Sequence, residues 1–79
     1  MELLEHGAAR GFAGAICSLG LCYENGTGVK SDPERAASLY ADASEKGHLP
    51  ATCNLAVCYL NGIGVSPSAA RAVELLEPT

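Results

Sequence analysis

Apolar and small side chains recur along this chain with the spacing of α-helices, about 3.6 residues per turn. Such stripes lie in residues 14–25, 32–46, 50–61 and 66–77. They consist of Ala15, Ile16, Leu19, Gly20 and Tyr23; of Ala36, Leu39, Tyr40 and Ala43; of Ala51, Leu55, Ala56 and Tyr59; and of Ala69, Ala72, Val73 and Leu76. The pattern predicts four helices, and residues 2–10 are expected to be the end of a further one.

Residues that begin and end helices stand between these stripes. Asp32 is expected to cap the second helix with Pro33 as its first residue, and Ser66-Pro67-Ser68 to cap the last. Gly47 is expected to end the second helix. Gly20 lies on an apolar stripe, where a small residue lets a neighbouring helix approach closely.

The stretch Ala15–Val29 returns 36 residues later as Ala51–Val65, with Ala, Cys, Leu, Cys, Tyr, Asn, Gly, Gly and Val kept in register. An internal repeat of this length is typical of stacked arrays. The sequence therefore predicts an all-α fold, an α-α superhelix (solenoid) of antiparallel helix pairs. We expect one array, cut from a longer one: residues 1–13 end a preceding repeat, 14–49 form a repeat, and 50–79 form a truncated repeat.

Charge and composition narrow the range of partners. The net charge is −4, only five residues are Lys or Arg, and Trp is absent. Because nucleic-acid binding depends on basic and stacking side chains, the composition argues against it. No apolar run approaches the ~18 residues that a membrane span needs. The N-terminus does not have the pattern of a signal peptide, so we expect a cytoplasmic protein, with a secretory route left open if the chain is a fragment.

The repeat resembles a known family. The spacing A-x-x-x-L-G-x-x-Y-x-x-G-x-G-V-x-x-D-x-x-x-A runs from Ala15 to Ala36, and the second copy keeps most of it from Ala51 to Ala72. This spacing is similar to that of the Sel-1-like repeat, a family related to the tetratricopeptide repeats. The second copy departs from it at Ala56, Ser68 and Leu76.

The resemblance implies a non-catalytic adaptor or scaffold that binds partner proteins in a groove lined by the first helix of each repeat. The residues off the buried stripe on those helices are Cys17, Leu21, Glu24, Cys53, Val57 and Leu60. This partly apolar strip suits an apolar peptide or helix. Alternatively, a missing repeat or a second copy covers it, and exposed repeat ends would allow self-association.

The alternative to an adaptor function is based on the four cysteines, Cys17, Cys22, Cys53 and Cys58. An i, i+5 pair on one helix points to different faces, so neither C-x₄-C pair should form a disulfide. Cys22 and Cys58 are expected to be small buried residues. The spacing also differs from the C-x₂-C of zinc sites. The alternative function is a cysteine-dependent metal site, in which His6 or His48 is a further ligand, or a secreted hydrolase-like repeat protein. We expect no cofactor, no metal and no catalytic residue.

Two short motifs receive structural interpretations. The loop Gly26-Thr-Gly28 with Lys30 follows a helix instead of a strand and lacks the P-loop spacing, so it is interpreted as a turn. Asn25-Gly-Thr27 matches an N-glycosylation acceptor, which matters only if the chain is secreted.

Overall fold

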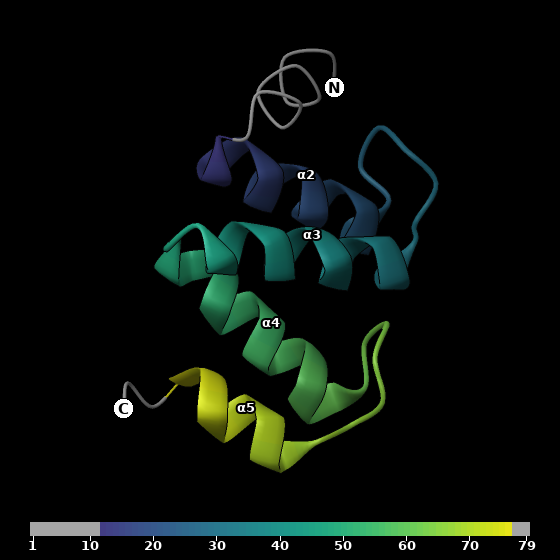
Figure 1. Cartoon of the computed structure of the whole chain (residues 1–79). Helices are drawn as coiled ribbons and strands as arrows, with labels where there is room; N and C mark the ends of the chain where they lie inside the picture. Colours follow the sequence, from purple (N-terminus) through teal and green to yellow (C-terminus); the bar gives the residue numbers. More distant parts are fainter. Residues whose placement is uncertain (1–11, 77–79) are drawn as a thin grey trace.

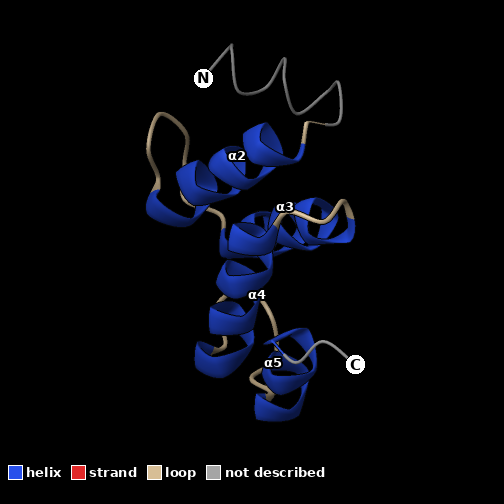
Figure 2. Cartoon of the chain, turned by 90° about the vertical axis from the view of Figure 1, so that its left-hand side faces the viewer, coloured by secondary structure: helices blue, strands red, loops and turns tan. Residues whose placement is uncertain are grey.

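The computed structural model describes residues 12–76, which form four α-helices and no strand. The helices are α2 (Ala13–Asn25), α3 (Pro33–Glu45), α4 (Leu49–Asn61) and α5 (Ala69–Leu76). They follow one another in a single stack from α2 to α5, and each packs against the next (Figures 1 and 2). The predicted α-α superhelix is confirmed. The helix expected in residues 2–10 lies outside the described residues.

The two repeats share one plan. We call α2 and α3 the first repeat and α4 and α5 the second, and α3 and α4 join the two. In each repeat a longer loop connects the first helix to the second, whereas only three residues separate α3 from α4. The short connection places α4 directly against α3.

Local sequence explains where the helices start. The Asp32 carboxylate accepts a hydrogen bond from the Arg35 backbone N–H at 3.2 Å, and Pro33 is the first residue of α3, as predicted. The Ser68 hydroxyl accepts from the Arg71 backbone N–H at 3.2 Å. The last helix therefore begins at Ala69, directly after the predicted capping segment Ser66-Pro67-Ser68, and Ser68 is the residue that caps it.

The core is built mainly from small residues, which lets the helices lie close together. It comprises Ile16, Cys17, Ala36, Ala37, Tyr40, Ala43, Ala51, Leu55 and Cys58. A Cβ atom added to Gly20 would lie 2.7 Å from the Tyr40 ring, which is fully buried. The close approach predicted at Gly20 is confirmed, and the Tyr40 ring occupies the space that a side chain at position 20 would fill.

A glycine also allows the two repeats to pack closely against each other. Gly64, in the loop after α4, has a φ of +71°, and an added Cβ would collide with the Pro33 carbonyl at the start of α3. The loop of the second repeat therefore rests directly on the backbone of the first. Gly-x-Gly is a structural turn here, and its second glycine belongs to the contact between repeats.

Candidate functional site

Four of the six predicted partner-binding residues lie on the surface of the first helices. Leu21 of α2 is 42% exposed and Val57, its equivalent in α4, is 45% exposed. Cys53 and Leu60 are also exposed. Cys53, Val57 and Leu60 are spaced i, i+4, i+7, so they share one face of α4. These residues give the first helices an outward apolar surface that no described part of the chain covers.

Cys17 does not belong to this surface, and its predicted position off the buried stripe was wrong. Its side chain is only 3% exposed, and the Asn54 side-chain amide donates a hydrogen bond to its sulfur at 3.6 Å. The periodicity of α2 cannot show this burial, because the covering residue comes from α4 of the next repeat.

Glu24 is half-buried and already has a partner inside the molecule. The Tyr40 hydroxyl donates a hydrogen bond to Glu24 Oε1 at 2.7 Å, which links α3 to α2. Burial and the neighbouring carboxylate raise the pKa of Tyr40 well above its usual range, so the phenol stays protonated and donating. In the second repeat the equivalent residues are Leu60 and Leu76, which are both more than half exposed and cannot form this hydrogen bond.

The four cysteines differ in exposure: Cys17 and Cys58 are buried, Cys22 is half-buried and Cys53 is exposed. Cys58 is buried as predicted, whereas Cys22 is only half-buried. Burial raises the pKa of the Cys17 and Cys58 thiols, which keeps them protonated and makes them poor nucleophiles or metal ligands at neutral pH. Among residues 12–76, no three side chains of His, Cys, Asp or Glu come together as a group that could hold a metal ion.

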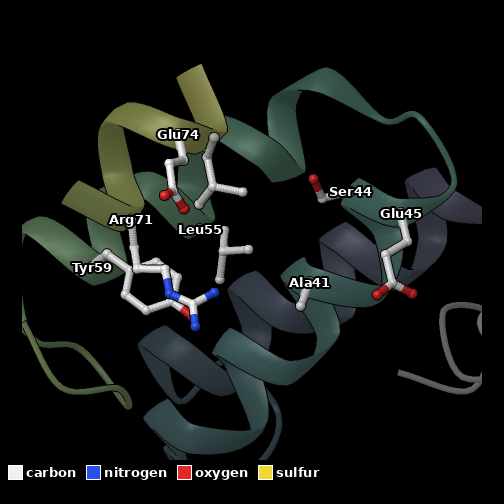
Figure 3. A pocket seen from close by; sticks show the side chains of 8 residues that line it. Ala41, Ser44, Glu45, Leu55, Tyr59, Arg71 and Glu74 are labelled. Atoms are coloured by element: carbon white, nitrogen blue, oxygen red, sulfur yellow. The ribbon is translucent and has the colours of Figure 1, made fainter. Parts of the chain in front are cut away.

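A pocket of about 280 Å³ opens between α3, α4 and α5 (Figure 3). Its lining residues are Ala41, Ser44, Glu45, Leu55, Tyr59, Arg71, Glu74 and Leu75. The lining combines aliphatic groups with one guanidinium and two carboxylates, and neither Cys nor His contributes to it. Leu55 and Tyr59 lie on a different side of α4 from Val57 and Leu60, so this pocket is separate from the outward apolar surface. No motif pointed to it, since its walls come from three helices.

Antiparallel helix pairs that repeat every 36 residues and stack in one row define an α-solenoid repeat protein. More specifically, this chain belongs to the Sel1 repeat family, whose model matches residues 13–48 and 49–78. Among the described residues, no helix is long and apolar enough to cross a membrane.

Two solved structures share the fold. One is c5321, a protective antigen present in uropathogenic Escherichia coli strains and described as displaying an SLR fold. It has a TM-score of 0.92 and 37% sequence identity, over 95% of this chain and 16% of that one. The other is a Sel1 repeat protein from Oxalobacter formigenes, with a TM-score of 0.87 and 36% identity, over 94% of this chain and 30% of that one. This chain thus spans less than a third of either relative. No curated protein matches it.

Proposed function

We propose that this chain is a non-catalytic protein-interaction module. It binds an apolar peptide or helix of a partner protein across the outward surface of α2 and α4, through Leu21, Val57 and Leu60. The single observation that carries this proposal is the exposure of an aliphatic side chain at the same position of both repeats, Leu21 and Val57.

The repetition at this position makes the surface suitable for an elongated partner. The hydrogen bond from Asn54 of α4 to Cys17 of α2 brings the two helices together, so a partner that crosses both helices meets an apolar side chain on each. Contiguous exposed apolar patches mark interaction sites, and Leu21, Val57 and Leu60 together supply such exposed apolar groups on the two helices. Sel1 repeats are generally protein-interaction modules, which agrees with this role.

Cys53 and Glu24 have secondary parts in the proposal. Cys53 shares a face of α4 with Val57 and Leu60 and borders the binding surface. Glu24 stabilises the binding surface indirectly, because its hydrogen bond with Tyr40 holds α2 in place beside α3. Cys17 is left out, since its buried sulfur is not accessible to a partner.

The test compares two variants with the wild-type chain in their binding of peptides selected on the wild-type chain from a displayed random library. Leu21→Glu and Val57→Glu together place two charges in the proposed surface and should weaken peptide binding by tenfold or more, since ~1.4 kcal/mol is one factor of ten. Val73→Glu is the matched control, because Val73 is an exposed aliphatic residue of α5 at 48% exposure. It should leave the affinity unchanged.

Circular dichroism should give the same helical content for both variants and the wild-type chain. Equal affinity of the wild-type chain and the Leu21→Glu, Val57→Glu double variant would contradict the proposal. The cysteine-dependent alternative is tested by a native mass spectrum of the untreated chain. A metal-free chain with four free thiols agrees with an interaction module, whereas bound zinc would favour a metal site.

A further inference from the structure

The pocket between α3, α4 and α5 has charged groups on two opposite sides and apolar groups in the middle. Figure 3 shows Glu45 of α3 on one side and Arg71 and Glu74 of α5 on the other, with Leu55 of α4 between them. The half-buried Leu75 of α5 extends the apolar part of the lining. The pocket therefore suits a ligand with an aliphatic body and a charged end.

The two charged sides of the pocket differ in their net charge. Arg71 and Glu74 stand three residues apart on α5, so their opposite charges are neighbours and largely offset each other. On the other side, no ion pair within residues 12–76 includes Glu45, and the adjacent Lys46 is already paired with Asp42 at 3.2 Å. Glu45 is also the last residue of α3, where the helix dipole favours a positive charge. The side at Glu45 is therefore suited to one cation.

The first repeat shows that a tyrosine at this position of the repeat accepts a cation. The Arg35 guanidinium lies 5.0 Å from the centroid of the Tyr23 ring. The equivalent of Tyr23 in the second repeat is Tyr59, whose side chain lines the pocket. Aromatic faces attract ammonium and guanidinium groups within about 6 Å. The ring thus favours a cation over an anion as the occupant, whereas Arg71 is the one lining residue that opposes a cation.

We propose that this pocket binds a lysine side chain of a partner protein. The aliphatic stem of the lysine lies along Leu55 and Leu75, and its ammonium group reaches Glu45. A volume of about 280 Å³ is near the lower limit of ligand pockets, roughly 300–1,000 Å³, so one long side chain fits better than a drug-sized molecule. A free diamine is disfavoured, because its second ammonium group would lie against Arg71. The net charge of −4 also attracts a basic partner.

The test is a titration of the isotope-labelled chain with lysine capped at both ends, N-acetyl-lysine methylamide, followed by amide chemical shifts. Binding should shift the amides of residues 41–45, 55–59 and 71–75. Glu45→Gln should weaken binding by about two- to fivefold, the range expected when one exposed ion pair is lost. Arg71→Gln should instead strengthen binding by a similar factor, because it removes the charge that opposes the ammonium group.

The matched control is Glu34→Gln, which removes the same charge from the other end of the same helix. Glu34 is exposed in the first turn of α3 and does not line the pocket. This variant should bind capped lysine as the wild-type chain does, with the same helical content by circular dichroism. Equal weakening by Glu34→Gln and Glu45→Gln would mean that only the net charge matters, and it would overturn the inference.

Three further ligands and one further variant complete the test. Capped norleucine has the same number of side-chain carbons without the ammonium group and should bind more weakly than capped lysine. Equal binding of these two, or stronger binding of capped glutamate or of the free diamine putrescine, would overturn the inference. The Leu21→Glu, Val57→Glu double variant should bind capped lysine normally, and Glu45→Gln should bind the library-selected peptides normally. The pocket and the outward surface of α2 and α4 can therefore fail independently.

Discussion

At the scale of single residues, Gly64 and Gly47 illustrate two different reasons why a position requires glycine. Both have positive φ, +71° and +87°. A Cβ atom at Gly64 would collide with the Pro33 carbonyl, whereas a Cβ atom at Gly47 would meet nothing within 4 Å. Gly47 is therefore needed only for its backbone conformation, and Gly64 also for the contact between the repeats.

We expect Gly47→Ala to lower the free energy of unfolding by ~1–2 kcal/mol, the cost of a left-handed conformation for a residue with a Cβ. Gly64→Ala should cost a further ~1–3 kcal/mol, because backbone atoms in a packed contact must move apart. Urea unfolding followed by circular dichroism measures both values. Equal losses in the two variants would show that the loop does not rest on α3.

At the scale of helices, the pair Gly20 and Tyr40 shows how the first repeat fits its two helices together. The first repeat combines no side chain at Gly20 with a large, fully buried ring at Tyr40. The second repeat has Ala56 and Leu76 at the equivalent positions, and Leu76 is 52% exposed. The hydrogen bond from Tyr40 to Glu24 has no counterpart there, because the equivalent residues are Leu76 and Leu60. The close fit between Gly20 and Tyr40 therefore belongs to the first repeat and is not repeated in the second.

A double-mutant cycle tests this interpretation. Gly20→Ala alone should destabilise the chain, since the new Cβ lies 2.7 Å from the Tyr40 ring. Tyr40→Leu alone should also destabilise it, because the hydrogen bond to Glu24 is lost. Together they recreate the pair of the second repeat, and the loss should be smaller than the sum by about 0.5–3 kcal/mol. If urea unfolding gives additive losses of free energy, residues 20 and 40 do not limit one another's size, and the interpretation is wrong.

Periodicity and turn chemistry were sufficient to predict the helices. Asp32 and Pro33 begin α3 where expected, and the glycine on the stripe of α2 has the predicted neighbour. The candidate site was harder to predict, since exposure depends on which helix lies beside each face. Leu21 and Val57 are exposed as expected, but Cys17 is covered by Asn54 of another repeat. A helical pattern shows which residues share a face and cannot show what covers that face.

At the scale of the whole molecule, the contact between α3 and α4 joins the two repeats, and Ala37 and Val73 test it as a matched pair. They are the same position of the repeat, but Ala37 is 3% exposed beneath α4 and Val73 is 48% exposed on α5. Ala37→Glu would bury a carboxylate without a partner between the repeats. We expect it to lower the free energy of unfolding by ~3–5 kcal/mol, a large part of the stability of a small domain.

Val73→Glu places the same charge at the same position in water, so it should change the free energy of unfolding by no more than about 0.5 kcal/mol. Urea unfolding measures both variants, and amide hydrogen exchange should show that Ala37→Glu loosens α4 and α5 more than α2. A similar loss for the two variants would mean that the α5 face is already covered in solution. A large difference would show that α4 covers Ala37 in the folded chain, whereas no part of residues 12–76 covers Val73 to the same extent.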